Sequence, residues 1–173
     1  MPLPTDPHRA RHHDDPAIRA ATADDFAWLL ALNNAYAAEV NAYTPADFAA
    51  LMAIAARVRI ADDAGFLLAL SEATPVQGPN HAWFLAREPQ FLYIDRIVIA
   101  ARAQGYGLGR ALYDDLAQAA GDRPLCCEVN LEPANPASLA FHARLGFAPC
   151  GEARDPRNGK RVQYLIRRHR PAR

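Results

Sequence analysis

Hydrophobic positions recur along this chain with two periods, and the change of period separates predicted helices from predicted strands. Apolar residues spaced three and four apart begin at Phe26 and again at Phe48, where Thr44-Pro45 supplies a cap and a first-turn proline. A nearly continuous apolar and β-branched run, Phe91–Ala100, instead predicts a strand buried on both faces. The predicted helices lie at about 22–37, 44–55, 108–120 and 136–146, and the predicted strands at 17–20, 58–61, 66–71, 91–100, 125–131, 147–154 and 160–167.

Turn-forming residues connect these elements and define two hairpins. The segment Asp62–Gly65 separates one pair of strands, and Asn158-Gly159 lies in the turn of the last pair. Residues 72–90 contain three prolines and a glycine, so we expect an irregular connection there. The resulting order, β-α-α-β-β-β-α-β-α-β-β, predicts an α/β (α+β) fold in which helices cover the faces of a mixed sheet.

Composition narrows the class of protein. A length of 173 residues suits one domain, and 51% hydrophobic with 22% charged residues is typical of a globular chain. Nineteen basic residues balance nineteen acidic ones, which argues against a nucleic-acid partner. The chain has no run of 18 apolar residues that would predict a membrane span. Three cysteines and a first segment without an apolar stretch favour a reducing cytoplasm.

The first segment differs in composition from the rest of the chain. Residues 1–16 are rich in proline, histidine, arginine and aspartate, so we expect a flexible leader, followed by a single domain at 17–173. The spacing of His8, His12 and His13 resembles that of metal ligands, but no rigid element would hold the three side chains in place. We therefore expect no metal site.

A glycine-rich turn joins the predicted strand Phe91–Ala100 to the next helix, with the sequence Gln104-Gly-Tyr-Gly-Leu-Gly-Arg110. Such a turn exposes backbone N–H groups to an anion at the positive end of a helix. A Walker loop fails, because Arg110-Ala111 follow the last glycine where Lys and Ser or Thr are required. The dinucleotide fingerprint also fails in both registers. Of the three anion-binding patterns considered, the one that remains is Gln-x-x-Gly-x-Gly, formed by Gln104, Gly107 and Gly109.

A second motif follows the strand Leu125–Leu131. The segment Asn135–Phe147 contains Asn, Ser, His and Gly-Phe in the order N-x-x-S-x-x-x-H-x-x-x-G-F. Together the two motifs resemble those of the GNAT acetyltransferase superfamily, over roughly residues 17–168. The strings Asp95–Val98 and Glu128–Pro133 look most similar to a branch of bacterial predicted acetyltransferases of unassigned substrate.

The resemblance implies a mostly antiparallel sheet with a splayed central parallel pair that admits acetyl-CoA as cosubstrate. One strand would pair with the pantetheine arm, the glycine loop would hold the pyrophosphate, and the start of the last helix would contact the arm. The residues implied for these contacts are Ile97, Val98, Ile99, Gln104, Gly105, Tyr106, Gly107, Leu108, Gly109, Arg110, Asn135 and Ser138.

The implied reaction is attack of a neutral amine on a thioester, which needs a base for the amine and benefits from a proton donor for the leaving thiolate. Many relatives place a tyrosine where this chain has His142, and we expect His142 to be the donor. We expect Asp95 to be the base, directly or through water, with Glu128 as its rival. A salt bridge would be the structural alternative for Asp95.

By the same resemblance, the end of the first helix walls the acceptor pocket, to which we assign Asn34, Tyr36, Glu39 and Glu128. The predicted function is N-acetylation of a small amine or a peptide amino group by direct attack in a ternary complex. Two alternatives stay open: a CoA-binding regulatory domain without turnover, and an acyltransferase that uses another acyl group. We expect no membrane or nucleic-acid partner, and a monomer or homodimer.

Overall fold

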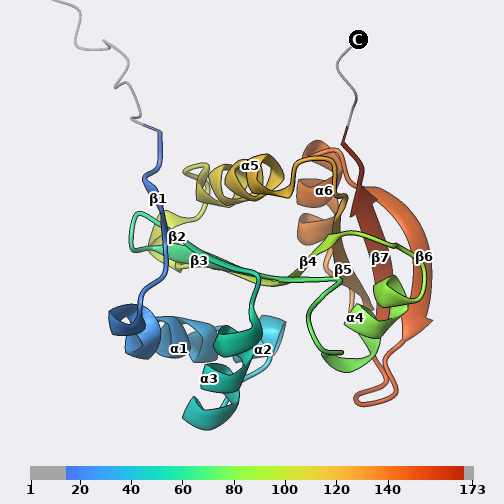
Figure 1. Ribbon diagram of the computed structural model, residues 1–173, viewed down its shortest axis with the longest axis horizontal. Helices are drawn as coiled ribbons and strands as arrows, with labels where there is room; N and C mark the ends of the chain where they lie inside the picture. Colours follow the sequence, from blue (N-terminus) through green and yellow to red (C-terminus); the bar gives the residue numbers. More distant parts are fainter. Residues whose placement is uncertain (1–14, 170–173) are drawn as a thin grey trace, which may run out of the picture.

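The computed structural model describes residues 15–169, which form a seven-stranded sheet covered by helices on both faces (Figure 1). The strands lie side by side in the order β1-β2-β3-β4-β5-β7-β6. All neighbours are antiparallel except β4 and β5. The strands are β1 (Ile18–Ala20), β2 (Arg57–Ala61), β3 (Gly65–Ser71), β4 (Leu92–Ile99), β5 (Leu125–Glu132), β6 (Ala148–Arg154) and β7 (Arg161–Arg167). The predicted mixed sheet with one parallel pair is confirmed.

Two separate hydrophobic clusters hold the helices to the sheet. One cluster packs α5 (Leu108–Ala120) and α6 (Pro136–Arg144) against one face. The other packs α1 (Phe26–Ala35), α2 (Ala37–Val40), α3 (Pro45–Ile54) and α4 (Gly78–Leu85) against the opposite face. Short 3-10 turns at Ala23–Asp25 and Ala101–Ala103 precede α1 and the glycine loop. Burial of both sheet faces explains why the central strands are apolar without alternation.

The parallel pair separates after its first two residues. Leu92 lies opposite Leu125 and Tyr93 lies opposite Cys126, and no later residue of β4 pairs with β5. The rest of β4 pairs only with β3, up to Ile99 opposite Gly65. The edge of β4 that faces β5 therefore carries unpaired backbone groups over its second half, as the resemblance implied.

A β-bulge interrupts β4 at its centre. Leu68 lies opposite Arg96 and Ala69 lies opposite Ile94, so that Asp95 has no partner across the ladder. An extra residue in one strand reverses which side chains face each side of the sheet. Tyr93 and Arg96 consequently lie on the face of α1–α4, whereas strict alternation would have separated them.

Two local features differ from the sequence-based expectation. Residues 72–90 are not irregular throughout, because Gly78–Leu85 form α4, with Pro79 in its first turn, where a missing N–H costs nothing. The first predicted helix is also interrupted at Tyr36, whose ψ of 31° ends α1 before α2 begins. Of the predicted leader, 1–16, residues 1–14 with its three histidines lie outside the described residues.

Candidate active site

The glycine loop takes its shape from two left-handed residues. Gly105 and Gly107 have φ values of 84° and 87°, a region that residues with a Cβ adopt only with strain. A Cβ at either position would meet no protein atom within 4 Å, so the space above the loop is open. The Gln104 side chain ties the loop down, since its Nε2 donates to the Ile99 carbonyl at 3.0 Å. The loop is thus held in one shape with an open outer face.

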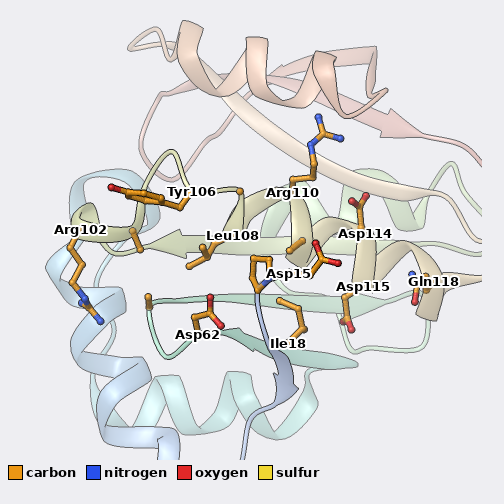
Figure 2. Close-up of a pocket in the computed structure, with 15 residues that line it drawn as sticks. Asp15, Ile18, Asp62, Arg102, Tyr106, Leu108, Arg110, Asp114, Asp115 and Gln118 are labelled. Carbon is orange, nitrogen blue, oxygen red and sulfur yellow. The ribbon is translucent and has the colours of Figure 1, made fainter. Parts of the chain in front are cut away.

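The start of α5 presents free backbone donors to that open face. Ala111 donates the first helical bond, to the Gly107 carbonyl at 3.0 Å, so the preceding N–H groups of the first turn have no helical partner. Gly109 lies where α6 approaches, and a Cβ there would come within 3.1 Å of the Phe141 ring. The side chain of Arg110 points away from Ile18 and Asp62 and toward the C-terminal elements (Figure 2).

Figure 2 shows a surface hollow of about 770 Å³ on the flank of α5 that faces β1 and the β2–β3 turn. The carboxylates of Asp15, Asp62, Asp114 and Asp115 lie around it. Among them, Asp115 binds Arg59 at 2.8 Å and Asp62 accepts from the Ala17 N–H at 2.8 Å. Arg102 and Arg110 line the hollow as well, beside Gly107 and Leu108 of the glycine loop, so its wall carries charges of both signs.

A second cavity, of about 300 Å³, opens where β4 and β5 separate. It is more enclosed and more polar than the first, and it collects side chains from α2, α4, β4, β5, α5, α6 and the β6–β7 loop. Its polar and aromatic lining residues include Glu39, Asn80, Tyr93, Asp95, Arg96, Tyr113, Glu128, Asn135, Ser138, His142 and Arg157. The cavity therefore brings together most of the predicted catalytic and acceptor residues.

Glu128 lies on β5 at the start of the separation. Its carboxylate accepts a hydrogen bond of 2.6 Å from the Tyr93 hydroxyl. Burial raises the pKa of Glu128 to about 7, an effect that the Tyr93 hydrogen bond partly opposes and the nearby Asp95 reinforces. A carboxyl group with this pKa exchanges protons near neutral pH, as a general base must.

Asp95, the bulge residue of β4, is committed to an ion pair. Its Oδ2 binds the Arg96 guanidinium at 2.7 and 2.8 Å. Arg96 is buried and donates further bonds to the Asn33 side chain at 2.7 Å and to the Tyr43 hydroxyl at 3.1 Å. This network ties β4 to α1 and to the segment before α3, and it is the salt bridge that the sequence offered as the alternative role.

His142 is buried on α6 and both of its ring nitrogens have partners. Nδ1 lies 2.8 Å from the Ser138 carbonyl, which only accepts, so Nδ1 carries the proton. Nε2 then accepts from the Tyr113 hydroxyl at 2.7 Å. Burial lowers the pKa of His142 below 6.5, although the Ser138 carbonyl opposes the shift. The ring is therefore neutral at pH 7 and its N–H is already engaged.

Some of the remaining predicted residues line the cavity and others do not. Asn135 caps α6, accepting from the Ser138 N–H at 3.1 Å, and both residues line the cavity. Glu39 also lines it, from α2. Asn34 and Tyr36 are not among its lining residues. The Asn34 amide instead exchanges two hydrogen bonds of 2.9 Å with the backbone of Tyr43, which closes the turn after α2.

Several cavity residues escaped the sequence analysis, Tyr113 and Arg157 among them. Tyr113 is four residues after Gly109, so it lies on the face of α5 that α6 approaches, and this helical spacing was the available signal. Arg157 is in the β6–β7 loop, and no local pattern distinguishes it from the other arginines of that hairpin. Within the described residues, no group of three His, Cys, Asp or Glu side chains is arranged to hold a metal.

The two cysteines of β5 are structural. Cys126 and Cys127 are buried, and burial raises the pKa of both thiols, so neither forms a thiolate at neutral pH. In the part of the chain that the structure describes, no helix has both the length and the apolar content needed to span a bilayer.

The chain belongs to the acetyltransferase (GNAT) family, whose model matches residues 6–147. The protein is accordingly an acyltransferase with the fold and the cleft of that family. The match covers the glycine loop, the separation of β4 and β5, and α6, which are the parts that the sequence motifs had singled out.

Solved structures with the same fold support this assignment. A protein described as histone acetyltransferase HPA2 and related acetyltransferase, from Corynebacterium glutamicum, has a TM-score of 0.70 at 18% identity, over 92% of this chain and 100% of that one. The ribosomal-protein-alanine N-acetyltransferase of Brucella melitensis has a TM-score of 0.65 at 20% identity, over 88% and 99%.

A phosphinothricin acetyltransferase from Sinorhizobium meliloti, in complex with acetyl-CoA, has a TM-score of 0.65 at 19% identity, over 90% of this chain and 89% of that one. Identities this low establish a shared fold and leave the acceptor open. A comparison with curated proteins finds no match.

Proposed function

We propose that this protein transfers an acetyl group from acetyl-CoA to a primary amine by direct attack in a ternary complex. The observation that carries the proposal is the separation of β4 from β5 after Tyr93 and Cys126, which leaves one edge of β4 unpaired up to the glycine loop. A pantetheine arm carries amides that can pair with such an edge as an additional strand would.

The cofactor contacts follow from that edge. Ile97, Val98 and Ile99 offer backbone groups to the pantetheine arm, and the N–H groups from Gly105 to Arg110 face the pyrophosphate. Asn135 and Ser138 contact the arm from α6. Gln104 supports the loop through Ile99. Neighbours of the same fold, from Salmonella typhimurium and Sinorhizobium meliloti, were solved with acetyl-CoA, which supports its use here.

We assign the role of general base to Glu128. Its pKa of about 7 lets it take a proton from the amine at neutral pH, and the Tyr93 hydroxyl orients the carboxylate. Asp95, the base expected from the sequence, is paired with Arg96, so its carboxylate is already engaged by a buried guanidinium. Asp95 stays the rival, and the two substitutions below separate them.

The departing thiolate needs a hydrogen-bond donor, and the structure offers two linked groups. His142 is neutral, with its N–H bound to the Ser138 carbonyl, so it is a weak donor as it stands. Burial raises the pKa of Tyr113 well above 10, which keeps its hydroxyl protonated. By rotating about its C–O bond, that hydroxyl can turn from His142 to the sulfur. We propose that His142 orients Tyr113, and that Tyr113 stabilises the thiolate.

The proposed function is tested by mixing the protein, acetyl-CoA and a library of primary amines and measuring the release of free CoA thiol. Amine-dependent release supports the transferase. Tight binding of acetyl-CoA in calorimetry without release by any amine would instead indicate a CoA-binding regulatory domain. Repeating the assay with propionyl-CoA and succinyl-CoA decides whether acetyl is the preferred acyl group.

A further inference from the structure

One cation of the cavity, Arg157, takes no part in the proposed acetyl transfer. Arg157 lies in the loop between β6 and β7, beside the start of α4 (Figure 1). It lines the same cavity as Glu128 and Tyr93, and its guanidinium is close enough to interact electrostatically with both groups.

Two contacts hold this guanidinium in place. Asp155, which is only 3% exposed, binds Nε at 3.0 Å and Nη2 at 2.7 Å, and it also accepts from the Arg157 N–H at 2.9 Å. Gly78, with φ of 71°, lies against the other edge, where a Cβ would come within 2.6 Å of Nη1. A glycine here leaves room for the guanidinium, and the buried carboxylate fixes its orientation.

Because residue 78 has no side chain, Nη1 of Arg157 keeps N–H donors that a ligand can use. Of the residues that the structure describes, none accepts a hydrogen bond from Nη1 of Arg157, and 56% of the side chain is exposed. The other cavity arginine, Arg96, contrasts with it, because Arg96 is buried and donates to Asp95, Asn33 and Tyr43. Arg157 is therefore the cavity cation that is both oriented and able to bind an anion.

We infer that the acceptor carries a carboxylate near its amine, as a free amino acid does, and that Arg157 binds this carboxylate. The inference rests on the proposed function and adds the substrate class. Arginine binds carboxylates through paired N–H donors, and here a preorganised guanidinium loses little entropy on binding. The cavity volume of about 300 Å³ is at the lower end for ligand pockets, which suits a small acceptor better than a long peptide.

The experiment compares L-amino acids with their C-terminal amides as acceptors, each pair differing only in the carboxylate. We expect kcat/KM of the parent enzyme to favour the acid by roughly 10- to 100-fold, the range for a hydrogen bond to a charged group. In Arg157→Gln the ratio of acid to amide falls close to one, mainly through a higher KM for the acid. Arg157→Lys keeps the charge and restores part of the preference.

A matched control is Arg154→Gln, because Arg154 is an exposed arginine of the same hairpin that binds Glu132 and the Gly159 carbonyl and does not line the cavity. Its ratio should equal that of the parent. A parent ratio near one, or an unchanged ratio in Arg157→Gln, overturns the inference. If neither acids nor amides release thiol, the transferase proposal fails, and calorimetric binding of the same acids and amides with CoA present still decides whether Arg157 reads a carboxylate.

Discussion

The two ends of the cleft are built in different ways. The glycine loop is one continuous segment, in which Gly105 and Gly107 adopt left-handed conformations and the first turn of α5 follows at once. The acceptor end is assembled from α2, β4, α4, β5 and the β6–β7 loop, which are far apart in sequence. A phosphate site needs only backbone N–H groups at a helix start, whereas an acceptor site needs particular side chains at particular distances.

The two carboxylates of the cleft show the same contrast on a smaller scale. Asp95 lies beside Arg96 in the chain and is paired with it, whereas Glu128 meets Tyr93 only because two strands lie together. The adjacent pair ties helices to the sheet, whereas burial between the strands raises the pKa of Glu128 to about 7, although the Tyr93 hydrogen bond opposes the shift. The predictions below test whether chemistry depends on the distant contacts and cofactor binding on the local ones.

The largest effect is expected for Glu128→Gln, which removes the proposed base and keeps the shape. Turnover should fall by roughly 10²–10⁴ with little change in acetyl-CoA affinity. Because only the ionised carboxylate accepts the amine proton, kcat of the parent enzyme should rise with pH through about 7. The variant should not show this rise. Stopped-flow or steady-state thiol release over pH 5 to 9 measures both.

Asp95→Asn is the matched comparison for that substitution, and we expect it to reduce turnover much less and to leave the pH limb in place. If Asp95→Asn instead abolishes turnover and Glu128→Gln does not, the base is the residue expected from the sequence.

The next effect concerns stability. Arg96→Met removes the cation that binds Asp95, Asn33 and Tyr43, leaving a nearly buried carboxylate without its partner. Breaking one side of a buried ion pair costs about 3–5 kcal/mol. Urea unfolding should show this loss, and the double variant Arg96→Met/Asp95→Leu should recover part of it. A loss below about 1 kcal/mol would mean that the network does not hold the acceptor end together.

A smaller effect is expected for the pair of Tyr113 and His142. Tyr113→Phe and His142→Phe should each reduce kcat by about tenfold while acetyl-CoA binding is retained. The double variant should lose no more than the worse single variant, because both act through one hydroxyl. His142→Gln, which can still accept from Tyr113, should retain more activity than His142→Phe. Additive losses would show that the two residues act independently.

An effect of similar size is expected at the glycine loop, on cofactor affinity. Gly107→Val introduces a side chain on the open face, and acetyl-CoA affinity should fall at least tenfold, about 1.4 kcal/mol, in calorimetry. Gly121→Val is the matched control: it has φ of 60° and open space as well, but lies at the other end of α5. Equal losses in the two variants would place the cofactor away from the loop.

Local patterns in the sequence predicted much of this molecule. Hydrophobic periods located all seven strands and most helices to within a few residues, because burial of both sheet faces imposes those patterns directly. Turn residues located both hairpins, and the glycine spacing located the strand-to-helix loop. Helix α4 was missed because its first-turn Pro79 and Gly78, with prolines on either side, have the composition of a loop. Packing of Trp83, Phe84 and Leu85 on the sheet stabilises this short helix, together with the hydrogen bonds that Asn80 and His81 make to Tyr164 and Ser71.

Tertiary structure alone decided which residues meet in the cleft. The bulge at Asp95 places the Arg96 side chain on the sheet face that α1–α4 cover. This change of face depends on how β3 and β4 align. Sequence reasoning identified Glu128 and His142 as candidates, but the burial that shifts both pKa values and the hydroxyl partners Tyr93 and Tyr113 depend on other elements. Protonation depends on burial and on neighbours within a few ångströms, and those neighbours are brought together only when the chain folds.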